Sequence, residues 1–278
     1  MDTNIWYKLA HIDRRILWAI QVLVMAAVLL RPIGLPIPVG SQTQNMYDFY
    51  ESLPEGSIVL FEFGYDPSGE HELGPMVAAM FHHAFQRGLR VVGNGLWTFG
   101  PTLAQQTYEE IAPQYDVEYG VDFVNLGFNA GQEVLAMAMV DDLWEAVRGV
   151  DYDGNRLADL PLMAEVPRLT ADYVAAICVF AEGNPGTREW LHAVTERTGI
   201  PLTSGTITML VPEAQTYIDA GQYRAIIPGN RGAAEYEFLV GAPGPAIAGQ
   251  DVLSAMSIYL WVLIVVGNIA FMKMSKRR

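Results

Sequence analysis

Apolar residues follow two patterns along this chain, with long runs near both ends and short runs in the middle. The run Val252–Met272 holds 21 residues without a charge, which as a helix is about 31 Å long and matches the hydrocarbon core of a bilayer. We therefore predict a transmembrane helix over 251–272 and a basic tail over 273–278.

The first apolar run is shorter, with 15 residues between Arg15 and Arg31. It reaches spanning length only if both arginines extend to the interface or if the proline-rich stretch after it contributes. We predict a transmembrane helix over 16–35 and a stem over 36–56. A cleaved signal peptide is the alternative, although no small-residue cleavage site follows the run.

Between the two runs, short apolar segments alternate with segments of helical periodicity. The strand-like segments are Ser57–Phe63, Arg90–Val92, Asp122–Gly127, Tyr173–Phe180, Pro201–Met209 and Arg224–Ile227. Helical patterns follow them at Leu73–Ala84, Leu103–Ile111, Glu133–Val147, Arg188–Thr198, Glu213–Ala220 and 232–240.

Strands with continuous apolar sequence, each followed by a helix, are typical of a parallel sheet covered on both faces. We predict one α/β domain over 57–250, built on a mostly parallel, Rossmann-like doubly wound sheet of about six strands. One transmembrane helix flanks this domain on each side.

Lysine is confined to the outer sides of the apolar runs, at Lys8, Lys273 and Lys276. Because basic residues favour the cytoplasmic side, we predict a cytoplasmic N-terminal segment over 1–15, a cytoplasmic C-terminal tail and an extracytoplasmic central domain. Gln21 and Asn268 would then lie at similar depth in the bilayer. They could form a hydrogen bond between the helices, or each could reach interfacial water.

Acidic residues dominate the central segment, where residues 32–250 carry 28 acids and 9 arginines, a formal charge of 9 − 28 = −19. This charge excludes a nucleic-acid-binding protein, which needs a basic face. Cys178 is the only cysteine, so no intramolecular disulfide can form. Its place inside an apolar strand predicts a buried structural thiol.

Glycine-rich turns with polar side chains follow nearly every predicted strand. Ligands of open α/β sheets bind outside the carboxyl ends of the strands, so these turns are candidate ligand-binding positions, although short turns need the same residue types merely to turn. The candidates are Asn125, Asn129, Asn184, Asn230 and Arg231. Arg231 could equally form an ion pair with Glu235, four residues later in the helix.

Two glutamates interrupt apolar strands near their carboxyl ends, at Glu62 and Glu182. Burial there would raise a carboxyl pKa, and neighbouring strands would make the two a general acid/base pair. The alternative is that each lies at an exposed strand end and accepts hydrogen bonds from turn amides.

The sequence indicates no metal site and no cofactor. The segment Asp151-Tyr-Asp-Gly-Asn-Arg-Leu-Ala-Asp159 resembles a calcium loop through Asp151, Asp153, Asn155 and Asp159, but glycine falls at position 4 instead of 6, and position 12 is Leu162 rather than glutamate. His71, His82, His83 and His192 are interpreted as surface residues.

Without a catalytic signature, the paired spans are the best functional evidence. We expect a subunit that contacts the bilayer and assembles with copies of itself or with other membrane proteins. A ligand-binding or sensing domain that uses the glycine-rich turns is the first alternative. A membrane-tethered hydrolase that uses Glu62 and Glu182 is the second.

Overall fold

The computed structural model describes residues 12–31, 33–34 and 37–275, which form two compact units. The α/β unit comprises residues 37–246, and the anchor unit comprises the described residues before 37 and after 246. Each unit is described by itself.

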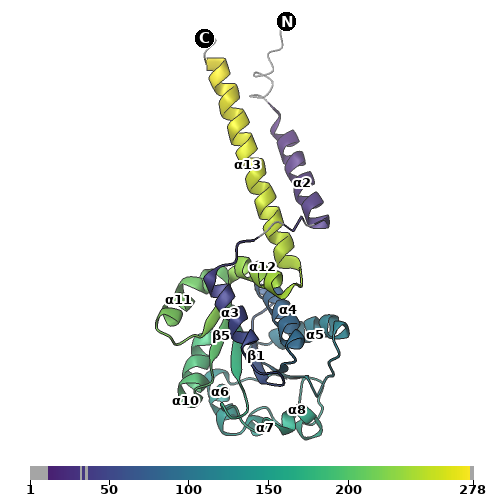
Figure 1. Ribbon diagram of the computed structural model, residues 1–278, viewed down its shortest axis with the longest axis vertical. Coiled ribbons are helices and arrows are strands. Elements are labelled where there is room, and N and C mark those ends of the chain that lie inside the picture. Colours follow the sequence, from purple (N-terminus) through teal and green to yellow (C-terminus); the bar gives the residue numbers. More distant parts are fainter. Residues whose placement is uncertain (1–11, 32, 35–36, 276–278) are drawn as a thin grey trace. The chain divides into compact units, whose positions relative to one another are not determined.

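A six-stranded parallel sheet forms the centre of the α/β unit, with the strand order β3-β2-β1-β4-β5-β6 (Figure 1). β1 lies in the middle of the sheet, with β2 and β3 on one side of it and β4, β5 and β6 on the other. This is the strand order of doubly wound sheets. The strands are β1 (Ile58–Gly64), β2 (Arg90–Gly95), β3 (Phe123–Phe128), β4 (Ala176–Ala181), β5 (Leu202–Thr206) and β6 (Ala225–Pro228).

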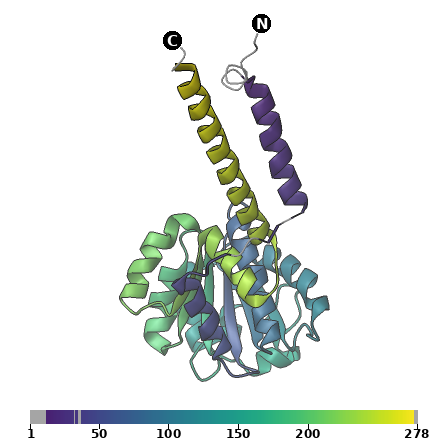
Figure 2. The ribbon, with the colours of Figure 1, turned by 45° about the horizontal axis from the view of Figure 1, so that its top comes forward.

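Helices cover both faces of this sheet, as the turned view in Figure 2 also shows. One face carries α3 (Ser41–Glu51), α4 (Glu70–Gln86), α5 (Gly100–Ile111) and α12 (Gly229–Val240). The other carries α6 (Gln132–Asp141), α7 (Leu143–Ala146), α8 (Pro161–Ala164), α9 (Thr187–Trp190), α10 (Glu196–Thr198) and α11 (Val211–Asp219), with a π-helical turn over Leu191–Thr195 that joins α9 to α10.

The core differs in chemistry between the two faces. Under α4 and α5 it is aromatic, with Phe61, Phe63, Phe81, Phe123 and Phe180 in ring contact and fully buried. Under α6 to α11 it is mainly aliphatic. Strands that are buried on both faces explain why the sequence lacks polar alternation in this region.

The predicted parallel α/β sheet of six strands is confirmed, and each predicted strand overlaps an observed one. The predicted stem over 36–56 differs from the structure, because α3 lies within it and belongs to the α/β unit. Met46 and Tyr50 of α3 are fully buried, and the Tyr50 hydroxyl is 3.0 Å from the Thr203 hydroxyl of β5. Because the sequence of α3 is polar, this helix was not predicted; tertiary contacts stabilise it.

Cys178 is fully buried in β4 as predicted, and burial raises the pKa of its thiol to about 12. The interpretation of His83 as a surface residue is wrong. His83 is 1% exposed, its Nδ1 is 2.6 Å from the Tyr236 hydroxyl, and its ring stacks on Tyr47. Because α12 also covers this side of α4, the flank that periodicity placed in solvent is buried.

The anchor unit contains α2 (Arg14–Leu30) and most of α13 (Pro245–Ser275). Among the described residues, α13 is the one helix long and apolar enough to cross a membrane. The predicted first span over 16–35 is not supported, because α2 has 17 residues, about 25 Å, and ends before Arg31. Arg31 precedes proline and leaves the helical region, with φ −143° and ψ 84°, since a following proline disfavours helical backbone.

The topology that places both termini in the cytoplasm depends on that first crossing and has no support from the structure.

Two polar contacts join the segments of the anchor unit. Asp251 accepts hydrogen bonds from the Ile33 and Gly34 N–H groups, and the Tyr259 hydroxyl donates to the Leu17 carbonyl. Gln21 is half-buried and Asn268 is exposed, and no hydrogen bond joins them within the described residues.

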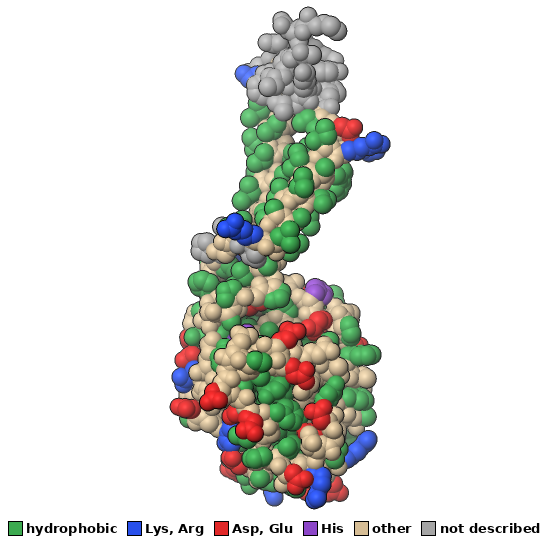
Figure 3. All heavy atoms as spheres, turned by 90° about the vertical axis from the view of Figure 1, so that its right-hand side faces the viewer, with side chains coloured by type: hydrophobic (Ala, Val, Ile, Leu, Met, Phe, Trp, Pro, Cys, Tyr) green, Lys and Arg blue, Asp and Glu red, His purple; other side chains and the backbone are tan. Residues whose placement is uncertain are grey.

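Surface chemistry separates the two units. On the face shown in Figure 3, acidic side chains are spread over the α/β unit, whereas hydrophobic side chains line the helices of the anchor unit. Exposed leucine, isoleucine, valine and tryptophan side chains occur along α13, such as Leu260, Trp261 and Ile264. A helix with this surface is suited to lipid rather than to water.

A buried carboxylate attaches α3 to the rest of the α/β unit. Glu235 is 3% exposed and accepts hydrogen bonds from the Gly40 N–H, the Thr43 hydroxyl and Arg231 Nε.

We expect Glu235→Ala to destabilise the α/β unit by about 3 kcal/mol, because three donors lose their acceptor. Thermal unfolding of the detergent-solubilised chain measures the effect. Glu133→Ala, at an exposed position of α6, should change stability by less than about 0.5 kcal/mol, and equal losses in the two variants would contradict the assigned role.

Candidate functional site

The crevice where ligands of doubly wound sheets usually bind lies between the carboxyl ends of β1 and β4. Here the protein fills it with its own side chains. The Glu182 carboxylate accepts hydrogen bonds from the Asp66 N–H (2.9 Å) and the Ser68 hydroxyl (2.6 Å). The Trp97 indole N–H donates to the Pro185 carbonyl, and its ring lies against Gly183.

Glu182 also packs against the start of α4, where a phosphate binds in dinucleotide-binding proteins. A Cβ atom at Gly69 would lie 2.6 Å from Glu182 Oε2, so glycine is required for this contact. The Glu182 carboxylate thus occupies the hydrogen-bond donors that a bound anion would need at this position.

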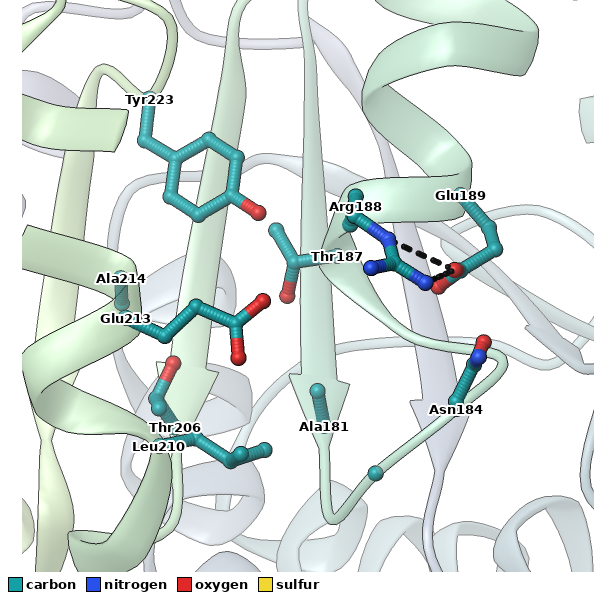
Figure 4. Close-up of a pocket in the computed structure, with 11 residues that line it drawn as sticks. Ala181, Asn184, Thr187, Arg188, Glu189, Thr206, Leu210, Glu213, Ala214 and Tyr223 are labelled. Carbon is teal, nitrogen blue, oxygen red and sulfur yellow. Dashed lines mark hydrogen bonds and ion pairs between the residues drawn. The ribbon is translucent and has the colours of Figure 1, made fainter. Parts of the chain in front are cut away.

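An open cavity of about 250 Å³ lies beside this closed crevice, at the carboxyl ends of β4 and β5 (Figure 4). It is enclosed by the turn after β4, the start of α9, the end of β5 and the start of α11. The lining residues are Ala181, Gly183, Asn184, Thr187, Arg188, Glu189, Thr206, Leu210, Glu213, Ala214 and Tyr223.

Hydroxyl groups form the buried polar part of this cavity. The Thr187 and Thr206 hydroxyls each lie 2.8 Å from the Ser204 hydroxyl, which donates to the Val179 carbonyl of β4. Tyr223 is 5% exposed, and burial and then the neighbouring Tyr217 and Glu213 raise the pKa of its phenol. The phenol therefore stays protonated and can donate a hydrogen bond.

Charged groups of both signs stand at the rim of the cavity. Arg188 Nε and one terminal nitrogen both bond to Glu189 Oε1, at 3.1 and 2.9 Å. This pair raises the pKa of Arg188. Glu213 projects between Thr187 and Leu210 in Figure 4, and its carboxylate accepts no hydrogen bond from the described residues. A ligand could therefore meet a free carboxylate on one side and a guanidinium on the other.

The predicted ligand-binding residues are not brought together. Asn184 lines the cavity, where its amide nitrogen can donate to Glu189. Asn125 is buried on the face of α5 and bonds to Pro101 and Gln105, whereas Asn129 bonds to Asn94 and to the Leu126 carbonyl.

Asn230 and Arg231 lie in the first turn of α12. Arg231 forms the ion pair with Glu235 that its spacing suggested, at 2.8 Å. Arg231 lines a different hollow, between α12 and α3.

Glu62 is 1% exposed and lies inside β1. Burial raises its carboxyl pKa to about 8, against the opposing effect of hydrogen bonds from the Leu96 N–H and the Asn94 amide, both 2.6 Å long. Glu182 has different donors, from the turn after β1, and neither carboxylate lines the cavity. The structure thus places both glutamates as acceptors that hold loops.

The calcium-like segment folds as a self-contained turn. Asp151 is 5% exposed and accepts hydrogen bonds from the Asp153 and Asn155 N–H groups, the Asn155 amide and the Tyr119 hydroxyl. Asp153, Asn155 and Asp159 are exposed. Within the described ranges, no group of three or more acidic, histidine or cysteine side chains is placed to hold a metal ion.

Sequence reasoning missed Thr187, Arg188, Glu213 and Tyr223 as a set. The signal available was that Thr187 and Arg188 directly follow the glycine-rich turn after β4, at the start of a helix. Nothing in the sequence pattern links Thr187 and Arg188 to Glu213, which lies in α11, or to Tyr223, which lies in the segment after α11.

Comparison of the chain with protein-family models, with curated proteins and with solved structures gives no match.

The buried carboxyl of Glu62 should make stability pH-dependent. Since its folded-state pKa of about 8 lies above the unfolded value, its contribution is fully present below about pH 4.5 and is lost as the pH rises through 8. Between pH 6 and 8, wild-type stability should fall relative to Glu62→Gln by up to about 1.4 kcal/mol per pH unit. Parallel pH profiles of unfolding for the two proteins would contradict this, and Glu133→Gln should follow the wild type.

Proposed function

We propose that this protein is a membrane-anchored binding protein for a small zwitterion of the amino acid kind. The observation that carries the proposal is the cavity at the carboxyl ends of β4 and β5, with Arg188 and Glu213 at its rim and hydroxyl groups in its interior (Figure 4).

The size and lining of the cavity support this ligand class. A volume of about 250 Å³ is below the usual range for drug-sized ligands and suits a molecule of about ten heavy atoms. Glu213 offers a carboxylate to an ammonium group, and Arg188 retains nitrogen donors for a carboxylate. Leu210, Ala181 and Ala214 leave room for an apolar side chain.

The anchor supports a site outside the cytoplasm. Lys273, Lys276, Arg277 and Arg278 follow the apolar part of α13, and the positive-inside rule places this tail in the cytoplasm. The α/β unit, which precedes α13, would then meet ligands of the external compartment.

Binding can be tested with the purified full chain in mild detergent. A panel of free L-amino acids, with uncharged monosaccharides as comparison, should contain a zwitterion that raises the melting temperature and saturates in calorimetry. Glu213→Gln should weaken that ligand at least tenfold, because the ammonium loses its charged partner. Glu133→Gln removes the same charge from α6 and should leave affinity within twofold.

Two outcomes would contradict the zwitterion site. If neither calorimetry nor thermal unfolding responds to any zwitterion, or if Glu133→Gln weakens binding as much as Glu213→Gln, the cavity is not a zwitterion site.

Assembly with other membrane proteins stays a second candidate, supported by apolar side chains at the opposite half of the same sheet edge. Phe99 follows β2, Phe128 ends β3, and Val134 lies in α6; they are 52%, 46% and 74% exposed. Exposed apolar side chains that form a patch are typical of contact surfaces, and these three lie at or after the carboxyl ends of neighbouring strands. For the hydrolase alternative, β1 and β4 are neighbouring strands as it requires, but Glu62 and Glu182 accept hydrogen bonds from separate loops.

Native mass spectrometry in mild detergent tests assembly. We expect a self-associated particle whose subunit number falls when Phe128→Ser and Val134→Ser are combined. Met209→Ser, an exposed apolar position in the turn after β5, serves as control. A strictly monomeric wild-type particle without a co-purifying protein would contradict the assembly role.

A further inference from the structure

Three hydroxyl groups are linked by hydrogen bonds at the β4 and β5 cavity. Ser204 of β5 is fully buried and does not line the cavity, whereas Thr187 and Thr206 line it and are 7% and 3% exposed. The hydroxyl oxygen of each threonine lies 2.8 Å from Ser204 Oγ. The direction of these two hydrogen bonds decides which groups the cavity offers to a ligand.

Ser204 fixes that direction, because a hydroxyl group carries only one proton. Ser204 Oγ donates this proton to the Val179 carbonyl at 2.9 Å, and a carbonyl can only accept. The contacts of Ser204 with Thr187 and Thr206 are therefore hydrogen bonds only if both threonines donate. Ser204 Oγ has two lone pairs, so it can accept both protons.

Both threonines consequently turn acceptors toward the cavity. Their protons are engaged with Ser204, and only lone pairs of their oxygens remain for a ligand. The Glu213 carboxylate, which Figure 4 shows turned toward Thr187, is also only an acceptor. Three side chains from three separate elements thus offer acceptors to the same space.

We propose that the cavity selects an unsubstituted primary ammonium group and binds it with Thr187, Thr206 and Glu213. This inference rests on the zwitterion site proposed above, and it adds the chemical class of the positive end of the ligand and its orientation. The ammonium lies at the threonines, and the carboxylate faces Arg188, whose nitrogens are donors.

The number of donors is what distinguishes a primary ammonium from its methylated forms. A primary ammonium carries three N–H donors and no acceptor, so it can supply one donor to each of the three side chains. A methylated ammonium brings fewer donors, and a quaternary one brings none. A buried threonine oxygen would then lose its contact with water and gain no partner, which weakens binding.

Ser204 is a positioning residue in this arrangement, since it holds the protons of both threonines without lining the cavity. Without its hydroxyl, Thr187 and Thr206 could rotate and donate as well as accept. The wall would then discriminate less between ligands that differ in their number of donors.

The test is calorimetric titration of the full chain in mild detergent with L-alanine, N-methyl-L-alanine and N,N,N-trimethyl-L-alanine. All three are zwitterions small enough for the volume of the cavity, and they differ in their number of N–H donors. L-alanine should bind at least about tenfold more tightly than the trimethyl form, with the N-methyl form between them.

Two variants separate donor counting from exclusion by size. Thr206→Val keeps the shape of the side chain and removes one acceptor, so it should weaken L-alanine at least about tenfold and the trimethyl form less than twofold. Ser204→Ala should lower the same preference for L-alanine, a readout that a merely structural role would not change. Thr107→Val is the control, because that hydroxyl bonds to Leu103 within α5, and both affinities should stay within twofold.

The outcomes distinguish this inference from the zwitterion site. Equal or tighter binding of the trimethyl form overturns the inference and leaves the zwitterion site in place. A preference for L-alanine that both Thr206→Val and Ser204→Ala preserve would show exclusion by size alone, and would also overturn it. Absence of binding by all three compounds would reject the zwitterion site and this inference together. The wild-type comparison needs no substitution, so the test holds even if a variant fails to fold.

Discussion

Carboxylates that accept hydrogen bonds from backbone N–H groups hold this fold together. With 28 acids and 9 arginines between residues 32 and 250, most acidic side chains cannot find a cation. The buried ones use main-chain donors instead: Glu62 binds Leu96, Glu182 binds Asp66, Glu237 binds Gly244 and Ala246, and Asp151 binds its own turn. A buried carboxylate is tolerated when such donors are fixed in place, and in return it fixes the loop that supplies them.

The positions of these buried carboxylates determine which parts of the α/β unit keep an accessible cavity. At the usual ligand crevice of the fold, Glu182 and Trp97 occupy the space and the donors, so the accessible cavity lies one strand further along, between β4 and β5. On the other face, Glu237 accepts a hydrogen bond from the Gly244 N–H and so fixes one wall of a groove between α4, α5 and the segment after α12.

Much of the fold could be predicted because its signals are local. Continuous apolar strands such as Ala176–Ala181 can only be buried on both faces, which requires helices on both sides. The polar helix Ser41–Glu51 could not be predicted, since its stability comes from Tyr50 and from Glu235, nearly 200 residues away in sequence. His83 was misplaced for the same reason: helical periodicity identifies one buried face, and α12 buries a second.

The sequence by itself determined the alternation of strands and helices, the acidic character of the central segment, the buried thiol of Cys178 and one helix able to cross a membrane. These properties follow from composition and periodicity within short segments. Only the tertiary structure decided that Glu182 closes the crevice beside β1 and that Thr187, Arg188, Glu213 and Tyr223 share a cavity. Hydrogen-bond partners and cavities depend on the spatial order of strands, which places residues far apart in the chain side by side.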